Sequence, residues 1–370
     1  MPIDARRPFT EMVEVAQNEL VREAASNVEG KYRGFINQVY LNDFPSLLPE
    51  KYIRKRGYIT AKADYTTGTV TVGTGTSNMV GASTSWTSAN SDGLIITVDG
   101  ADEAYRMTFE AGTSLTFQNS LAWVGSSGSG LGYRLVQNRY ALASDFSYLS
   151  ADSVDKPNVV SFMLNGVELF LSPLGNEEYD RNYSPKIVSD AFYGYTVKYE
   201  SSNIYLYVTP NPDSALNFGY WYIPELTAMV EYTTGTVTLT TGTAVTGSGT
   251  LWLSALNTAN TYYLRNDADG TGSASLWFKM STIGTNTAIT LSSSFTGTSG
   301  TGIAYTIAEI SKWPARFDDA MLYRTAYLGD PDNTQSTKWN AEYQRAVALD
   351  LTVESKRKRG HTLKYFPGKR

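Results

Sequence analysis

The sequence of 370 residues contains no cysteine and a single histidine. The missing cysteines exclude disulfide frameworks, cysteine-bound zinc, iron–sulfur clusters and thiol nucleophiles. The one histidine, His361, lies near the C-terminal end within a run of Lys and Arg, which is a poor place for a Ser-His-Asp triad or a histidine-rich metal centre. We therefore expect no enzyme, with no catalytic residues, no metal and no cofactor.

Long apolar runs are also missing. No stretch approaches 18 consecutive apolar residues, and the segment Met1–Arg7 lacks the apolar stretch of a secretory signal. We expect a soluble chain that is not exported and has no membrane partner. Charged residues make up only 18 % of the chain, while Gly, Thr, Ser and Tyr are abundant. This balance is typical of β-rich extracellular, adhesive or viral structural proteins.

Charge is unevenly spread along the chain. The 31 basic and 36 acidic residues give a net charge of −5. Residues 356–370 contain seven basic residues and no acid, so residues 1–355 carry −12. The chain is therefore an acidic body with a strongly basic end.

One heptapeptide, YTTGTVT, occurs twice, at 65–71 and at 232–238. A tryptophan follows each copy at a similar distance, Trp86 in the first and Trp252 in the second. Further matches occur in the same order: 105–107 with 278–280, 115–117 with 289–291, and 128–133 with 300–305. Short β-branched and aromatic runs alternate with Gly, Asn, Asp and Ser in both copies, which predicts two all-β modules inserted at 63–135 and 230–308.

The remaining segments have a different pattern. Apolar spacings of three and four predict helices over 10–27, 31–42, 317–328 and 339–353. In the last of these, the expected buried positions include Ala346 and Leu349. Alternating runs predict strands over 159–164, 167–171, 193–199, 204–208 and 217–223, the first two joined at an Asn165-Gly166 turn.

Outside the inserts, the chain resembles the head-to-tail connector, or adaptor, proteins of tailed bacteriophages. Three pieces in the same order carry the resemblance: 36–40; 204–213 with Tyr220 and Pro224; and 319–330 with Trp339 and Tyr343. The two inserts are similar to the Ig-like or β-sandwich-type modules found in phage virion proteins.

The resemblance implies an α+β fold with a helical-bundle plus β core of the connector type. This core would be discontinuous and comprise 1–62, 136–229 and 309–355, with inserted β-modules at 63–135 and 230–308 and an extended C-terminal arm at 356–370.

The resemblance also implies a structural role. Connector proteins form a ring, usually twelvefold, that docks on the portal protein and joins it to downstream neck or tail proteins, while double-stranded DNA passes through without specific binding. Fibres would attach through the inserts. The location implied is the head–tail junction of the virion, after synthesis in the host cytoplasm.

The basic end is the candidate docking site for the portal. Its residues are Lys356, Arg357, Lys358, Arg359, Leu363, Tyr365 and Phe366. Two other interpretations stay open: a solvated end without a partner, and a nucleic-acid contact. The apolar residues favour docking on a protein, because an arm that binds only phosphates does not need an apolar anchor.

Acidic groups offer no convincing active site. Asp318-Asp319 is expected in the first turn of a helix, where carboxylates stabilise the helix dipole. Asp102-Glu103 and Glu177-Glu178 are expected in polar loops. The segment 266–270 resembles the front half of a calcium loop but lacks its closing Glu, so a turn is expected there.

Tryptophans in the inserts allow a second function. Trp86 and Trp252 occupy matching positions and are expected in the module cores, whereas Trp123 and Trp277 have no twin. If such aromatics, together with Tyr262 and Tyr263, stacked on sugars, the chain would be a tail or receptor-binding adhesin that binds host glycans. A secreted glycan-active enzyme is disfavoured by the single histidine and the missing secretory signal.

Overall fold

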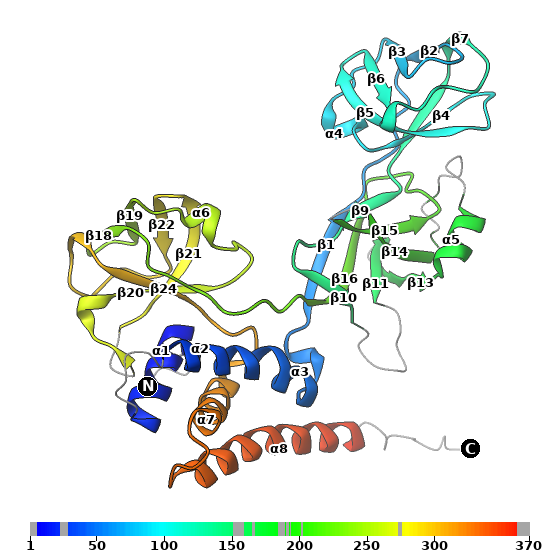
Figure 1. Ribbon diagram of the computed structural model, residues 1–370. Helices are drawn as coiled ribbons and strands as arrows, with labels where there is room; N and C mark the ends of the chain where they lie inside the picture. The colour runs from blue at the N-terminus through cyan, green and yellow to red at the C-terminus, as the bar shows by residue number, and fades with distance from the viewer. Residues whose placement is uncertain are drawn as a thin grey trace, which may run out of the picture. The chain divides into compact units, whose positions relative to one another are not determined.

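The computed structural model describes most of the chain, namely residues 6–22, 29–150, 159–164, 167–183, 189, 192, 194–200, 203–272 and 276–360. The chain folds as two compact units: unit 1 comprises 1–53 and 226–370, and unit 2 comprises 54–225. Each unit contains one of the duplicated β-modules (Figure 1). We call the module in unit 2 module 1 and the module in unit 1 module 2.

The expected fold class, a helical-bundle plus β core, is wrong. Strands account for 38 % of the structure and helices for 27 %, and almost all strand pairs are antiparallel. The reason is local: only the two ends of the chain have the helical period. Everything between 54 and 310 is dominated by short alternating runs, and these form sheets.

Two helical segments come from the N-terminal end of unit 1. The first is α1 (Phe9–Glu14) with the π-helical turn Val15–Val21, and the second is α2 (Glu29–Gln38) with a π-helical turn over Val39–Asp43 and α3 (Phe44–Leu47). A short 3-10 turn, Glu50–Tyr52, follows. Helices were expected at both places. The C-terminal end supplies a 3-10 turn at Ala315–Phe317, α7 (Asp318–Gly329) and α8 (Ser336–Gly360), which confirms the expected helix pair.

Both ends of the chain share one aromatic core. The ring of Phe44 lies 5.8 Å from Trp313, 5.9 Å from Phe317 and 6.5 Å from Tyr343, measured between centroids. Gly329 closes α7 directly against the ring of Tyr32, where any Cβ would overlap that ring. The helices therefore pack through segments nearly 300 residues apart in the sequence.

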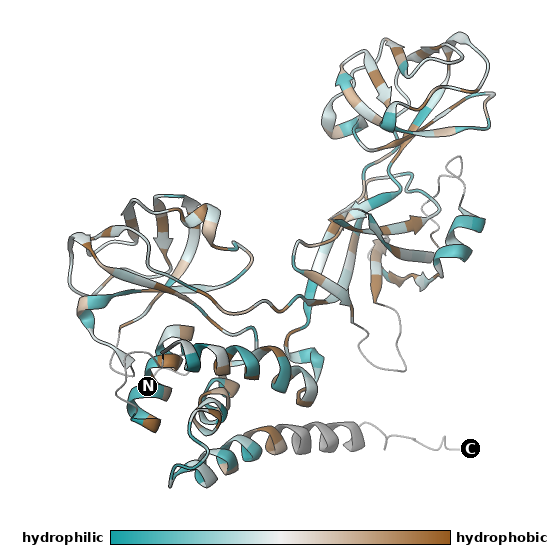
Figure 2. Cartoon of the chain, in the orientation of Figure 1, coloured by the Kyte–Doolittle hydropathy of each residue, from teal (hydrophilic) through white to brown (hydrophobic). Residues whose placement is uncertain are grey.

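The buried face of α8 differs from the expected one. Trp339, Tyr343 and Val347 are buried at a spacing of four, whereas Leu349 is 65 % exposed. Positions four apart follow one side of an α-helix, and Leu349 lies two residues beyond the last of them. Figure 2 shows both hydrophilic and hydrophobic residues along the coloured part of this helix.

Two small sheets form unit 2 outside its module. The first has the order β1 (Lys55–Thr60), β16 (Asn217–Pro224), β11 (Val160–Leu164) and β12 (Val167–Phe170), with β10 (Phe146–Leu149) also pairing with β16. The second has the order β13 (Ser172–Pro173), β14 (Gly194–Glu200), β15 (Asn203–Thr209) and β9 (Arg139–Ala141). A short helix, α5 (Asn176–Asn182), packs against β14.

Strands expected in this region are confirmed. Leu164 pairs with Val167, so β11 and β12 form the predicted hairpin, although Asn165 and Gly166 lie outside the described residues. Side chains from both sheets, including Tyr140, Leu206 and Phe218, form one buried cluster.

Module 1 is a seven-stranded antiparallel arrangement in the order 7-2-3-6-5-4-8. Its strands are β2 (Thr69–Val72), β3 (Asn78–Ala82), β4 (Ile95–Val98), β5 (Ala104–Ala111), β6 (Ser114–Phe117), β7 (Gly128–Leu131) and β8 (Tyr133–Val136). A short helix, α4 (Ser88–Ser91), and a 3-10 turn, Gln118–Ser120, lie in its connections.

Module 2 repeats this order of strands and adds one strand at the edge. Its strands are β17 (Glu231–Tyr232), β18 (Thr236–Leu239), β19 (Ala244–Ser248), β20 (Tyr262–Asn266), β21 (Phe278–Thr285), β22 (Ala288–Leu291), β23 (Gly300–Ile303) and β24 (Tyr305–Glu309). Their order is 17-24-20-21-22-19-18-23, with α6 (Trp252–Ala255) and a 3-10 turn (Asp267–Asp269) in the connections.

The duplication extends to single hydrogen bonds. Trp86 Nε1 donates to the hydroxyl of Tyr133 over 3.0 Å, and that hydroxyl donates to the carbonyl of Thr67 over 2.7 Å. In module 2, Trp252 Nε1 donates to Tyr305 over 2.8 Å, and Tyr305 donates onward over 2.7 Å. Both tryptophans are buried, which confirms their expected core positions. Burial also raises the pKa of Tyr133 to about 12 and raises that of Tyr305.

The matched hydrogen bonds predict matched losses of stability. Tyr133→Phe and Tyr305→Phe each leave a buried indole N–H and a carbonyl without their partner. We expect each change to lower the free energy of unfolding of its own unit by about 2 kcal/mol. Denaturant unfolding followed by tryptophan fluorescence measures both. A loss in one module and none in the other would contradict an equivalent role for the two bonds.

Candidate interaction surfaces

The predicted docking residues fall at and beyond the end of α8. Lys356, Arg357, Lys358 and Arg359 lie within α8, which ends at Gly360. Leu363, Tyr365 and Phe366 lie outside the described residues. The first five residues of the expected extended arm are therefore helical. Lys and Arg are good helix formers, and cations near a helix C-terminus are stabilised by the helix dipole.

Length sets α8 apart from its partner helix. It has 25 residues against 12 in α7. At a rise of 1.5 Å per residue, the two helices are roughly 37 Å and 18 Å long. α7 and α8 pack against each other, but α7 accounts for only half of the length of α8. The four cations lie in the final turns of the longer helix.

The acidic pair Asp318-Asp319 is structural. Both residues lie in the first turn of α7, as expected. Asp318 forms an ion pair with Arg6 over 3.4 Å, and Asp319 accepts a hydrogen bond from Arg7 Nε over 3.1 Å. Burial raises the pKa of Asp318 to about 6 despite the nearby Arg6. The pair joins the N-terminal segment to α7.

The other acidic candidates do not form a catalytic or metal site. Glu177 and Glu178 were expected in a loop, which is wrong, because they lie in the first turn of α5. The segment 266–270, which resembles part of a calcium loop, forms a tight 3-10 turn as expected. Asn266 Oδ1 caps this turn by accepting a hydrogen bond from Ala268 N over 3.0 Å. Among the described residues, no group of three or more His, Cys, Asp or Glu could hold a metal ion. Asp102-Glu103 lies in the connection between β4 and β5, as expected.

An exposed face of unit 2 combines arginine and aromatic side chains. The guanidinium carbon of Arg54 lies 4.3 Å from the centroid of Trp221, and that of Arg56 lies 5.5 Å from Trp221 and 5.3 Å from Tyr58. Tyr58 is exposed and Trp221 is half-buried. We call these four residues the arginine–tryptophan face.

One ion pair crosses the sheet under this face. Arg56 on β1 reaches Glu168 on β12 over 2.8 Å, and Ser161 donates to the same carboxylate oxygen over 2.7 Å. The Arg56 side chain can cross the sheet because Gly219 on β16 has no side chain. A Cβ at that position would lie 3.2 Å from Arg56 Nε. Arg56 is thereby held flat against the sheet.

Composition suits the arginine–tryptophan face to binding a protein. Trp, Tyr and Arg are the residues that dominate the binding energy of protein interfaces, and an Arg guanidinium over an aromatic ring forms a cation–π contact. Sequence analysis missed this face. The alternation of Arg54, Arg56 and Tyr58 places these three side chains on one side of a strand. Trp221 joins them only through the pairing of β1 with β16, which the sequence does not indicate.

The module aromatics do not provide a sugar platform. Trp86, Trp123, Trp252 and Tyr262 are buried. Trp277 is half-buried, and the guanidinium carbon of Arg265 lies 4.8 Å from the centroid of its ring, which covers one face. Tyr263 is the remaining aromatic of that set, and it is half-buried on β20. Stacking on a sugar needs an exposed ring face, so the tryptophans of the modules lend no support to glycan binding.

Module 2 is fastened to the helices of unit 1 by buried charges. Arg265 donates to both carboxylate oxygens of Glu14, over 2.8 and 2.9 Å, and Gly272 N donates to Glu14 over 2.6 Å. Glu231 accepts a hydrogen bond from Thr10 over 2.8 Å and pairs with Arg33. The position of Arg265 is occupied by Thr97 in module 1, because Arg265 pairs with Thr306 as Thr97 pairs with Arg134. Module 2 has therefore diverged at its docking face.

Glu309 lies at the same junction and is buried without a full set of partners. One of its carboxylate oxygens accepts from Val230 N over 3.3 Å, and the other has no hydrogen bond. Burial raises the pKa of Glu309 to about 7, although Val230 N–H and Lys312 oppose the shift.

This raised pKa predicts a pH-dependent stability of unit 1. Between the ordinary pKa of Glu and about 7, the folded state binds more protons than the unfolded state, so stability falls as the pH rises through this range. We expect Glu309→Gln to be more stable than the native chain at pH 8 by up to about 3 kcal/mol, with the difference vanishing near pH 4. Urea unfolding at both pH values measures it. A native chain that matches the variant at pH 8 would contradict a buried, destabilising carboxylate.

Comparisons with known proteins identify no family. No family model matches the sequence, and no curated protein matches it. Among solved structures, translation elongation factor SelB from Methanococcus maripaludis, in complex with the GTP analogue GPPNHP, has 10 % identity and a TM-score of 0.16. The match covers 69 % of this chain, and the chain spans 64 % of that protein. A TM-score this low shows no shared fold. No helix in the described ranges is long and apolar enough to cross a membrane.

Proposed function

We propose that the chain is a structural virion protein that forms an oligomeric ring at the head–tail junction of a tailed bacteriophage. In this role it docks on the portal, joins it to the tail and lets DNA pass. The observation that carries the proposal is the basic end of α8 on an otherwise acidic chain. Residues 1–355 carry −12, while Lys356–Arg359 occupy the last turns of a helix twice as long as its partner.

Packing of the termini supports the proposal. The two helical pieces that resemble the connector family, 36–40 and 319–343, lie in one core. Trp313 Nε1 donates to the carbonyl of Tyr40 over 3.4 Å, and Arg324 on α7 donates to Asp43 over 2.9 Å. A ring protein needs a rigid base from which a docking helix projects. Buried aromatic contacts between the two ends of the chain provide such a base.

Charge supports the passage of DNA. Affinity for DNA grows with the number of phosphates that a protein neutralises with Lys and Arg. A body of −12 offers few such contacts, so duplex DNA can slide through a lumen lined by it. The helix end, by contrast, attracts an acidic protein surface and speeds the encounter with it.

Mixing the chain with the portal protein of its own phage tests the proposal. We expect native mass spectrometry to show a discrete complex with one ring of chains per portal, near twelve copies. An adhesin would instead give a small oligomer, commonly a trimer, that ignores the portal. A complex of that kind would overturn the proposed function.

A further inference from the structure

The first sheet of unit 2 has two open edges. Its order is β1-β16-β11-β12, and within the part of the chain that the structure describes no strand covers the outer side of β1 or of β12. In the second sheet, the edge strand β9 has three residues, and β13 has two, one of them Pro173. Short edges and proline protect a sheet from pairing with another chain. β1 and β12 are longer, with six and four residues, and neither contains proline.

The edge strand β12 is exposed on both of its faces. Val167, Leu169 and Phe170 are 58 %, 39 % and 51 % exposed. Side chains alternate along a strand, so Val167 and Leu169 lie on one face and Phe170 on the other. Glu168 carries the one charge of this strand. An exposed and largely apolar edge of this kind is a template for a further strand.

The backbone of β12 is directed outward at two residues. Leu171 N donates to Val160 O over 3.0 Å, so the backbone groups of Leu171 face β11. In an antiparallel pair, the N–H and C=O groups of successive residues point alternately to the two sides of the strand. Glu168 and Phe170 therefore direct these groups away from β11, toward the open side.

The backbone of β1 is also directed outward at alternate residues. Trp221 N donates to Val159 O over 3.1 Å, and Trp221 O accepts from Ser150 N over 3.0 Å, so the backbone groups of Trp221 on β16 face away from β1. Arg56 lies opposite Trp221, and its own backbone groups face away from β16. Arg56 and Tyr58 thus offer their N–H and C=O groups on the open side of β1.

The two edges match in direction and charge. Each of the pairs β1–β16, β16–β11 and β11–β12 is antiparallel, so β12 runs antiparallel to β1. A strand β12 laid beside β1 of a second copy therefore continues the antiparallel sheet. Residues 54–56 are all basic, whereas residues 160–170 contain one acid, Glu168, and no base. Like charges directly opposite destabilise a strand pair, which disfavours pairing of β1 with β1.

One register places the whole of β12 opposite β1. When the outward backbone groups of both strands face each other, Arg56 lies opposite Phe170 of the second copy and Tyr58 lies opposite Glu168. Residues 167–170 are then all opposite 56–59, whereas a shift by two residues in either direction moves part of β12 beyond the end of β1. Arg56 and Glu168 lie on one diagonal, and Tyr58 and Phe170 on the other, so opposite charges and aromatic rings are neighbours.

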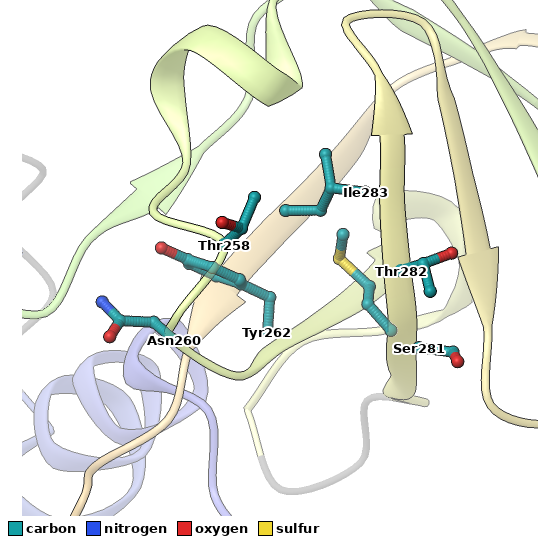
Figure 3. A pocket seen from close by; sticks show the side chains of 7 residues that line it. Thr258, Asn260, Tyr262, Ser281, Thr282 and Ile283 are labelled. Carbon is teal, nitrogen blue, oxygen red and sulfur yellow. The ribbon is translucent and has the colours of Figure 1, made fainter. Parts of the chain in front are cut away.

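The pocket of module 2 offers less to a second copy than these edges do. It is open, has a volume of about 280 Å³, and its lining includes Thr258, Tyr262, Met280 and Ile283. Figure 3 shows Thr258 and Tyr262 on one side and Ile283 on the other. None of its lining residues is charged, so the pocket has no charge with which to select a partner.

We propose that β12 of one copy pairs with β1 of the neighbouring copy, so that the first sheet of unit 2 continues from copy to copy. The inference rests on the proposed ring and names the surfaces that close it. Backbone hydrogen bonds supply affinity in such an added strand, and the alternating side chains supply its register. β1 and β12 are different surfaces, so the contact is heterologous, and heterologous contacts generate closed rings.

Cross-linking tests the contact without background, because the native chain has no cysteine. Tyr58→Cys and Glu168→Cys are made in separate chains, which are mixed, assembled on the portal and oxidised. Residues opposite each other in a hydrogen-bonded pair have Cα atoms about 5.5 Å apart, which suits a disulfide. We expect a disulfide-linked dimer, and a ladder of larger oligomers from a chain that carries both substitutions.

The matched control replaces Glu168→Cys with Met163→Cys. Met163 is 50 % exposed and lies opposite Glu168 on β11, one strand further from the neighbouring copy. Two strand spacings put its Cα roughly 10 Å from that of Tyr58 in the second copy, which is too far for a disulfide, and we expect no dimer. The Glu168→Cys chain alone is expected to give none either. A dimer of that chain alone would indicate pairing of β12 with β12 and overturn the inference.

Proline separates pairing through the backbone from contact between side chains. Phe170→Pro removes an outward N–H, and proline is tolerated at an edge where its nitrogen faces outward. We expect association between copies on the portal to weaken at least about tenfold, against at most about threefold for Phe170→Ala, which removes the ring and keeps the N–H. Titration followed by native mass spectrometry measures both. Equal losses would overturn pairing through the backbone.

The outcomes separate this inference from the proposed function. A ring that forms on the portal without the 58–168 cross-link overturns the inference alone, and so does equal cross-linking in the Met163→Cys control. A native chain that makes no ring on the portal overturns the proposed function, and the inference with it.

Discussion

Replacing Glu14 by Gln is expected to lower the free energy of unfolding of unit 1 by about 3 kcal/mol. The change leaves the guanidinium of Arg265 buried, with only Asp267 at 3.4 Å to balance its charge. Removing one partner of a buried ion pair costs roughly 3–5 kcal/mol, because the other charge stays desolvated. Differential scanning calorimetry should show the transition of unit 1 lowered by roughly 6–12 °C.

Module 1 provides the matched control. Its ion pair between Arg134 and Asp64 has an N–O distance of 3.1 Å, but the arginine side chain is 40 % exposed. Exposed pairs contribute less than about 1 kcal/mol. We expect Asp64→Asn to leave the transition of unit 2 nearly unchanged. Equal losses from both substitutions would contradict a special role of Glu14 in holding module 2 to the helices.

Neutralising the end of α8 is expected to abolish docking. The variant Lys356→Gln, Arg357→Gln, Lys358→Gln and Arg359→Gln keeps good helix formers but removes four positive charges. We expect portal affinity to fall at least 100-fold, which corresponds to about 2.7 kcal/mol. Affinity of the native chain should also decrease with added salt, and that of the variant should not. Surface plasmon resonance at two salt concentrations measures both effects.

Another change on the same helix controls for a general effect of charge. Lys338 and Arg345 are exposed on the first half of α8, and Lys338→Gln with Arg345→Gln removes two cations there. Portal affinity is expected to stay within about twofold of the native value. If both sets of changes weakened docking alike, the basic end would not be the docking site.

Patterns within short segments predicted the local structure well. Helices near 10–27, 31–42, 317–328 and 339–353, the β11–β12 hairpin and the core positions of Trp86 and Trp252 followed from periodicity, turn residues and the repeat. Each of these features depends on neighbours in the sequence or on a repeated motif. The fold class was wrong because strands account for more of the structure than helices do.

Contacts between distant segments could not be predicted. Glu14 and Arg265 are 251 residues apart, and nothing in either segment indicates the other. The arginine–tryptophan face depends on the pairing of β1 with β16. Trp123 has no twin in a direct sequence match. Its counterpart in module 2 is Phe295, which is also buried, because Trp123 N donates to Thr76 O as Phe295 N donates to Gly242 O. Tertiary pairing decides such features, and periodicity does not encode it.

Counting chains on the portal tests the central claim most directly. The native chain is mixed with the portal of its own phage, and the mass of the complex is measured by native mass spectrometry. The ring proposal predicts a single species with one closed ring, near twelve copies, on each portal. A chain that remains unbound, or that forms a stable trimer without affinity for the portal, would contradict it.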